Sequence, residues 1–488
     1  MRSMSNESII LGIHNHKIFK GFLGLLVFCT LASIYTESYL PYLLPAGMIG
    51  IGLIYDDYRR LFYLIFAVLP FSVEMYFEGA GLGTDLPSEP LMLLLTGITI
   101  GTLLTRQFSL KTHYVTHPIF LMIVLHVFWI FVTTINSSFL LISIKLFLAK
   151  LWYILPFFVL PLIFVRHNYD LEKAYRILYK FLFVAILIVL VRHALLDFSF
   201  AASYEVVRPF FRNHVNYAAI SVVCLPFVWA FMRINSLRKV SNKLMIFVFI
   251  TFITGIYFSY TRAAILSMVI AIGAWYIISF RKVKHALFVS SFIALVGIIY
   301  LSWDNKYMDF APNFERTITH TEFDNLIEAT YKLEDISSME RVYRWMAGIE
   351  MIKDRFWFGF GPGTFYSNYK AYSISRFQTY VSDNPDQSGI HNYFLMTWVE
   401  QGFIGFILFI ALCFILLIEG ERVYHICTDR EDKYIIMAST LGFIIIFAMC
   451  LINDLIETDK VGPFFFFNAA IIMFFSWKYS NAPKSNIE

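Results

Sequence analysis

Long apolar windows recur along almost the whole chain, and they constrain its fold more than any other feature. They run from Phe19 to Trp477, and each holds roughly 17–25 residues, enough to cross a hydrocarbon core of about 30 Å as a helix. Backbone polar groups find no partners in lipid, so such segments must be helical. With 58% hydrophobic and 15% charged residues, the chain is too apolar for a soluble domain. The sequence therefore predicts an all-α polytopic membrane protein with about 12–14 transmembrane helices.

The first apolar run, near Phe19 to Tyr35, has no small-residue cleavage signature after it, so we expect a retained helix and no removed signal peptide. Basic residues then set the orientation, because Lys and Arg stay preferentially on the cytoplasmic side. The basic connections fall after every second predicted span: Arg59–Arg60, Arg106 with Lys111, Arg166–Arg176, Arg233–Lys243, Arg281–Lys284, Arg422–Lys433 and the tail after Lys478. We therefore expect both termini in the cytoplasm.

This pattern divides the chain into three parts: N-terminal transmembrane helices over 1–303, a large external loop over 304–390 and C-terminal transmembrane helices over 391–488. In a bacterial inner membrane the loop would be periplasmic. Within it, helical spacing of apolar residues predicts an amphipathic helix over Glu334–Arg355. A run of glycines and a turn-rich segment follow, and the next span should extend from near His391 to about Ile418.

His391 is the main candidate for catalysis. It stands directly after the turn-rich segment and at the head of an apolar helix, where an imidazole can reach both water and lipid headgroups,. A general base at this place predicts activity that falls as the pH drops through the ordinary titration range of imidazole. The alternative is an interfacial histidine that caps or hydrogen-bonds the start of the helix. The neighbouring Asn392 is a further possible residue of the site.

Two arginines share one face of the predicted loop helix, since Arg341 and Arg344 are three residues apart,. Such a pair is suited to gripping a diphosphate by charge-assisted bonds. For Arg344 we favour a different interpretation, an ion pair with Glu340 on a solvated helix face. Arg341 has no acidic residue at i−4 or i+4 and remains a candidate for substrate binding.

Further basic residues lie on the predicted outer side, where the topology rule disfavours them. Arg262 sits in a short turn between two apolar spans, and Arg208 and Arg212 fall on the same side. Lys145 and Lys150 interrupt an apolar run in the outer half of the bilayer. Each of these side chains either snorkels to the interface or contributes to a basic site.

Other chemistry has little support in the sequence. The five cysteines show no paired spacing and resemble small buried hydrophobes,, so no metal site and no cofactor is predicted. A phosphate-binding glycine loop with Lys and Ser or Thr is missing from the sequence, as is a basic tail for nucleic acid. Asp454 and Glu457 follow a late span without any spacing that indicates a site.

Taken together, the loop residues resemble the signature domain of the bacterial O-antigen ligase and O-antigen polymerase superfamily, over about 244–418. The residues that carry the resemblance are Arg341, Trp345, Ala347, Met351–Asp354, Gly359, Gly361, Gly363, Phe365, His391, Asn392, Leu395, Glu400, Gly402 and Gly405. Thr261-Arg262-Ala263 is similar to the Ser-Arg-small turn of the family. Phe356 stands where the family usually has a proline, and the stretch Arg208–Asn216 fits only loosely.

The resemblance implies a fold like that of C-type glycosyltransferases and a metal-independent transfer of glycan from an undecaprenyl-diphosphate carrier. The acceptor would be a hydroxyl of lipid A core, for a ligase, or of another lipid-linked repeat unit, for a polymerase. Related enzymes glycosylate proteins. The expected partners are thus the lipid-linked donor, a glycan acceptor and membrane lipids, in the biosynthesis of lipopolysaccharide or another surface polysaccharide. A polysaccharide flippase or secondary transporter is the alternative, although it should show paired repeats of half the chain.

The topology generates the first testable prediction. A reporter that is active only in the cytoplasm should be active when fused at Ser480 and inactive when fused at Ser338, because the loop is expected outside. Paired fusions to a reporter that is active only in the periplasm provide the control. Cytoplasmic activity at Ser338 would overturn the external location of the loop and, with it, the outward-facing site.

Overall fold

A computed structural model describes residues 21, 23–33, 57–77, 82–105, 110, 112–310, 336–378, 382–384 and 387–480. The chain divides into two compact units, Met1–Leu64 and Ile65–Glu488. The first contains the short apolar helix Leu23–Ser33; the rest of the predicted first span lies outside the described residues. The second unit contains all the elements discussed below.

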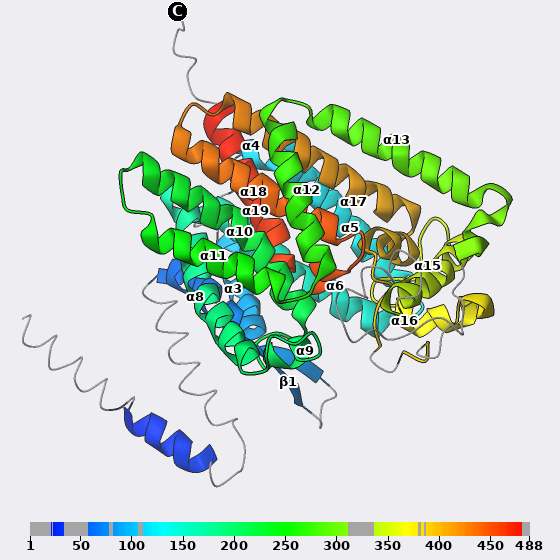
Figure 1. Cartoon of the computed structure of the whole chain (residues 1–488), viewed down its shortest axis with the longest axis horizontal. Helices are drawn as coiled ribbons and strands as arrows, with labels where there is room; N and C mark the ends of the chain where they lie inside the picture. The colour runs from blue at the N-terminus through cyan, green and yellow to red at the C-terminus, as the bar shows by residue number, and fades with distance from the viewer. Residues whose placement is uncertain are drawn as a thin grey trace, which may run out of the picture. The chain divides into compact units, whose positions relative to one another are not determined.

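Helices dominate the second unit, which confirms the all-α polytopic fold class (Figure 1). Eight described helices are long and apolar enough to cross a membrane: α5 Pro118–Ile135, the bent span Leu140–Phe164, α8 Asn168–Ala194, α10 His214–Leu237, α12 Arg262–Ser279, α13 Val283–Ser302, α17 Tyr393–Ile426 and α18 Arg430–Met449. Two shorter apolar helices, α3 Ser88–Leu104 and α11 Lys243–Tyr257, accompany them, as does the 19-residue helix α19 Gly462–Ser480. The total of 12–14 spans stays a prediction, since part of the N-terminal region is not described.

The smaller elements connect these spans. The bent span consists of α6 Leu140–Ile154, a π-helical turn Leu155–Val159 and α7 Leu160–Phe164. The remaining short helices and turns are 69–71, α4 Thr112–Val115, α9 Ser203–Val206, 303–310, α16 Phe365–Asn368, 369–372, 375–377 and 455–457. The sequence did not predict the hairpin of β1 Val73–Phe77 and β2 Leu82–Leu86, which pair antiparallel.

Three helices form the centre of the bundle. Most of α10 and α18 is buried, and α19 is buried along Gly462–Ser476. A helix that is apolar on all sides has no face suited to solvent, and α19 accordingly lies among other helices (Figure 1). Asn468 is a polar exception, and its side-chain oxygen accepts from the Tyr175 hydroxyl at 2.7 Å.

The predicted loop helix is confirmed as α15, Ile336–Asp354. The span predicted from His391 to about Ile418 is longer than expected, and it is broken at Gly402, whose φ of 71° and ψ of −177° are not helical. This conformation is essentially restricted to glycine. Gly402 therefore sets the course of the backbone within this span.

The glycine run Gly359–Gly363 binds directly to this break. The Phe360 and Gly361 amides donate to the carbonyls of Val399 and Glu400 at 3.0 and 2.9 Å. The Glu400 carboxylate accepts from the amides of Gly363 at 2.8 Å and Phe365 at 3.2 Å. Irregular backbone at membrane depth is stable only when its polar groups are paired within the protein. The run supplies those partners.

Other elements complete the pairing around the break. The Trp129 indole of α5 donates to the Gln401 carbonyl at 2.8 Å, and the Phe403 amide donates to the Phe356 carbonyl at 2.8 Å. On the far side of the run, the Ser143 hydroxyl of α6 donates to the Pro362 carbonyl at 2.7 Å. The glycine run thus joins α17 to α6, while Trp129 joins α5 to the same break.

Replacement of Gly402 tests this arrangement. A Cβ at this position would overlap the carbonyl group of Trp357, so we expect Gly402→Ala to destabilise the protein by about 1–3 kcal/mol from backbone strain alone. The measurement is the thermal unfolding temperature in detergent. Gly97→Ala in α3 is the matched control, because a Cβ there meets nothing within 4 Å and alanine is favoured within helices. Equal unfolding temperatures for the two variants would contradict the proposed role of the break.

Candidate functional site

His391 lies at the end of the bundle where α17 begins, which we call the His391 end. Its φ of 56° is left-handed, a conformation uncommon for residues other than glycine. Asn392 caps α17, since its side-chain oxygen accepts from the Leu395 amide at 2.9 Å. The Tyr393 amide donates to the carbonyl of Cys450, just after α18, at 2.9 Å. The capping role considered for His391 therefore belongs to Asn392.

Helix α15 holds the backbone that precedes His391. Arg344 Nη1 donates to the Gly389 carbonyl at 3.3 Å, and the Trp345 indole donates to the Ile390 carbonyl at 3.0 Å. Trp345, four residues after Arg341, thus binds the residue immediately before His391.

The predicted pairing of Arg344 with Glu340 is confirmed, with Nη2 and Oε2 3.4 Å apart. The expected solvated face was wrong, because both side chains are buried. Glu340 also accepts from the Ser382 hydroxyl at 2.6 Å. This buried pair consequently ties α15 to the turn-rich segment, and the Arg344 charge remains close to His391.

The surroundings of His391 disfavour its protonation. Burial, followed by the positive charges of Arg341 and Arg344, lowers the pKa of His391 to about 3, because both effects destabilise a second cation. The ring is nevertheless 29% exposed, so a substrate can reach it. The imidazole is therefore neutral at every physiological pH.

Asp454 is a neighbour that the sequence did not indicate. One carboxylate oxygen, Oδ1, lies 3.7 Å from His391 Nδ1, and Oδ2 closely approaches Gly389. Burial raises the pKa of Asp454 above its ordinary value. Asp454 follows α18 and lies 63 positions beyond His391, so no local pattern could have paired them. Both groups are shifted toward their neutral forms.

Arg262 belongs to the same end of the bundle. It is the first residue of α12, and the preceding Thr261 donates through Oγ1 to the carbonyl of His214, the first residue of α10, at 3.4 Å. The charge of Arg341 acts on both His214 and His391. The starts of α10, α12 and α17 therefore converge near α15, and His214 is a further site neighbour that sequence reasoning missed.

Arg208 and Arg212 have other partners. The Arg208 guanidinium stacks 4.6 Å from the centre of the Tyr204 ring and donates to its hydroxyl at 2.7 Å. Arg212 Nε donates to the Glu74 carboxylate of β1 at 2.8 Å. These contacts hold the segment before α10 against the hairpin. They do not bring either guanidinium to His391.

The two candidate lysines of α6 differ. Lys145 is exposed. Lys150 is buried, forms an ion pair with Glu457 at 2.7 Å and donates to the Tyr393 hydroxyl at 3.1 Å. Lys150 thus stabilises the start of α17 through its hydrogen bond to Tyr393.

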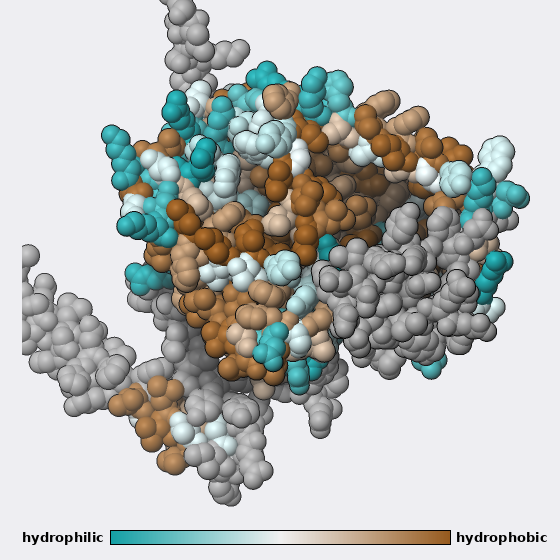
Figure 2. Space-filling model, viewed as in Figure 1, coloured by the Kyte–Doolittle hydropathy of each residue, from teal (hydrophilic) through white to brown (hydrophobic). Residues whose placement is uncertain are grey.

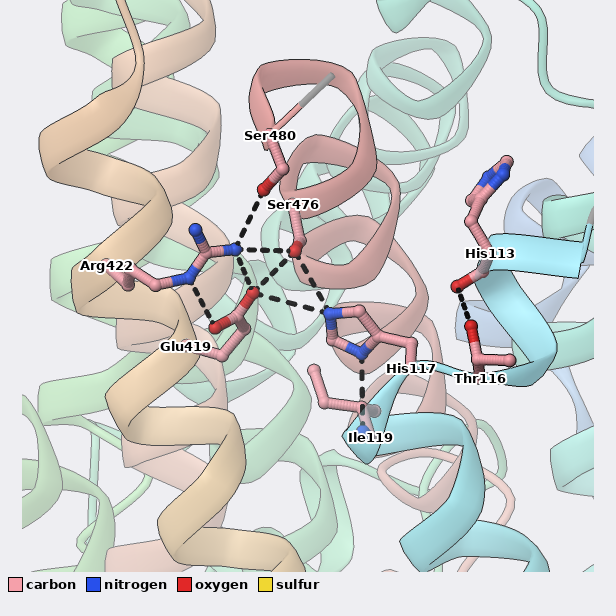
Figure 3. Close-up of polar contacts among 8 residues, drawn as sticks. All are labelled: His113, Thr116, His117, Ile119, Glu419, Arg422, Ser476 and Ser480. Atoms are coloured by element: carbon pink, nitrogen blue, oxygen red, sulfur yellow. Dashed lines mark hydrogen bonds and ion pairs between the residues drawn. The ribbon is translucent and has the colours of Figure 1, made fainter.

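The opposite end, which we call the His117 end, has a separate polar cluster (Figure 3). His117, at the start of α5, lies 3.0 Å from the Ser476 hydroxyl and 3.4 Å from Glu419. Arg422 donates to Glu419 at 2.8 and 2.6 Å and to Ser476 at 2.9 Å. The cluster joins α5, α17 and α19 through partners within the protein.

These features define a class: a multi-pass helical membrane protein with a neutral histidine beside arginines at one end of its bundle. Residues 247–410, about a third of the chain, match the family model described as O-antigen ligase. This match confirms the resemblance to the O-antigen ligase superfamily over these residues. A search of curated proteins finds no match. The match includes Arg262, Arg341 and His391, and it supports a membrane glycosyltransferase-like role in O-antigen biosynthesis.

The charge of Arg341 generates a prediction for the isolated protein. Because that charge lowers the pKa of His391, Arg341→Gln should raise this pKa from about 3 toward the ordinary value. Peptide-level mapping of diethylpyrocarbonate modification at a series of pH values reports the protonation of His391. Arg376→Gln, in the same loop, is the control and should leave the titration unchanged. An unchanged titration in Arg341→Gln would separate the two residues electrostatically.

Proposed function

We propose that this protein transfers a glycan from an undecaprenyl-diphosphate carrier to an acceptor hydroxyl at the periplasmic face of the bacterial inner membrane. The acceptor is lipid A core or another lipid-linked repeat unit. One observation carries the proposal: a partly exposed, neutral imidazole lies in the field of Arg341 and Arg344, within the region that matches the family.

The proposed roles follow from the reaction. The acceptor oxygen forms a bond to the anomeric carbon, the bond from that carbon to the diphosphate oxygen breaks, and the acceptor proton passes to His391. Negative charge develops on the departing diphosphate, so fixed cations stabilise the transition state. Arg262 and Arg341 supply them, and their planar guanidinium groups suit phosphate oxygens. No step requires a metal ion.

The low pKa of His391 makes it a weak base in the empty site. A bound diphosphate brings negative charge next to Arg341 and Arg344 and cancels much of their effect on the imidazole. The pKa of His391 then rises toward its ordinary value, and the ring becomes a better proton acceptor when the donor is present. The imidazolium that forms during transfer lowers the pKa of the neighbouring Asp454 in turn, and the resulting carboxylate stabilises the charged ring,.

The transporter alternative fits the described residues less well. Alternating access requires each end of the bundle to open in turn. At the His117 end, Ser476 of α19 bonds to Glu419 and Arg422 of α17, and His117 of α5 lies 3.0 Å from the Ser476 hydroxyl (Figure 3). Opening that end would break the hydrogen bonds of Ser476 on α19 with Glu419 and Arg422 on α17, which is costly because it leaves partly buried polar groups without partners,.

The proposal predicts that His391→Gln, which preserves hydrogen bonding but removes the base, reduces transfer by about 10²–10⁴-fold. The assay uses the purified protein in vesicles with a lipid-linked donor, and acceptor glycan is quantified on gels. His285→Gln on α13, an exposed histidine, should match wild type. If His391→Gln retains most of its activity while donor binding is normal, His391 is not the base.

The pH dependence corrects the expectation from sequence alone, a loss of activity through the ordinary imidazole range. The value of kcat/KM reports the free enzyme. It should fall only near pH 3, because activity is lost when the His391 imidazole becomes protonated. For kcat, which reports the donor complex, the acidic limb should lie at higher pH. Coincident limbs would argue against activation by the donor.

A further inference from the structure

Helices α12 and α13 are fixed together at one end only. A short turn connects them at the His117 end. There, the Val283 amide donates to the buried Glu421 carboxylate of α17 at 2.8 Å, and His425 of α17 lies 2.8 Å from the Ile278 carbonyl. From this root the two helices diverge toward the other end of the bundle, with α17 between them (Figure 1).

Helix α13 is exposed on all sides. Only 6% of its span is buried, whereas its exposed apolar residues point in every direction around the helix: Phe288, Val289, Phe292, Ile293, Leu295, Val296, Ile298 and Ile299. A peripheral membrane helix normally exposes one face to lipid and packs the other. Among the residues that the structure describes, none therefore covers most of the face of α13 toward the bundle.

A stripe of α12 is uncovered in the same way. Leu266, Ile270, Gly273 and Ile277 follow Arg262 at helical spacings of four and three, so they share its side of the helix. Leu266 is 56% exposed, and Ile270 and Ile277 are also exposed. A Cβ at Gly273 would meet nothing within 4 Å. The surface between α12 and α13 is hollowed and apolar (Figure 2), with the exposed Ile407 on α17.

We propose that this groove between α12 and α13 receives the isoprenoid chain of the lipid-diphosphate donor, an inference that rests on the proposed function. Arg262 stands at the head of the exposed stripe, so a chain that leaves a diphosphate at Arg262 continues directly along Leu266 and Ile270. The groove is open laterally, so a lipid enters from the bilayer without its charged headgroup crossing the hydrocarbon.

The groove acts by orientation rather than by hydrophobic gain. A lipid tail is already in an apolar medium, so its transfer from bilayer to protein releases little free energy. Its path fixes the direction in which the diphosphate and the attached sugar approach Arg341 and His391. At about 1.5 Å per residue, Gly273 lies roughly 16 Å along α12 from Arg262. Only the part of the carrier nearest the diphosphate is therefore held.

Photo-crosslinking tests occupancy without requiring catalysis. The full chain, with p-benzoylphenylalanine at Gly273, is placed in phosphatidylglycerol vesicles that contain radiolabelled undecaprenyl diphosphate. We expect a labelled adduct that unlabelled undecaprenyl diphosphate competes away and that Arg262→Ala reduces at least fivefold. The same photoreactive residue at Gly97 of α3, also in open space, is the control. Equal labelling at the two positions, or adducts with phospholipid alone, would overturn the proposal.

A blocking substitution provides the functional test. Gly273→Trp should reduce kcat/KM at least tenfold with an undecaprenyl-linked donor, and Gly97→Trp should not. With a geranyl-linked donor, whose chain ends before Gly273, both variants should match wild type. Equal activity of Gly273→Trp with the long donor would refute the groove. If the wild-type protein transfers no glycan, the proposed function fails, and the crosslinking result still decides whether the groove holds an isoprenoid.

Discussion

The break in α17 is the constraint on which the His391 end depends. At Gly402 the helix abandons its own hydrogen bonds, and this is possible within a membrane only because other segments replace them. Those segments are the glycine run and Trp129. The hydrogen bonds to α17 also hold the glycine run in place. Because α15 precedes the run, it is held against the start of α17. The clasp of Arg344 and Trp345 on the residues before His391 then follows.

Electrostatics gives this assembly its chemical character. Arg341 and Arg344 destabilise the protonated form of His391, because each positive charge opposes the protonation of the ring,. Here one arginine is balanced by Glu340, whereas Lys150 is balanced by Glu457 at a deeper level. These two ion pairs neutralise charge inside the protein. The His391 imidazole is neutral and partly exposed.

The sequence predicted those parts that depend on local patterns. Helical spacing located α15 to within about two residues, and the i,i+4 rule found the Glu340–Arg344 pair. Apolar length gave the spans and hence the fold class. Contacts between distant segments left no such pattern: Glu74 and Arg212 are 138 positions apart. The proximity of Asp454 to His391 likewise depends on the path of the chain after α18. The break at Gly402 was missed because a glycine in an apolar run gives the same sequence pattern whether the helix continues through it or is interrupted there.

The rooted hairpin of α12 and α13 has a mechanical consequence. With its twenty residues, α13 is about 30 Å long, and its firm attachment is at Val283. A rotation of about 10° at that root displaces the far tip by about 5 Å, simply from the length of the lever. Because Ile278 and Glu421 are both bonded to their partner helices, the pivot itself barely moves. Any rotation at this root would therefore change the width of the groove far more at the tip of α13 than beside Val283.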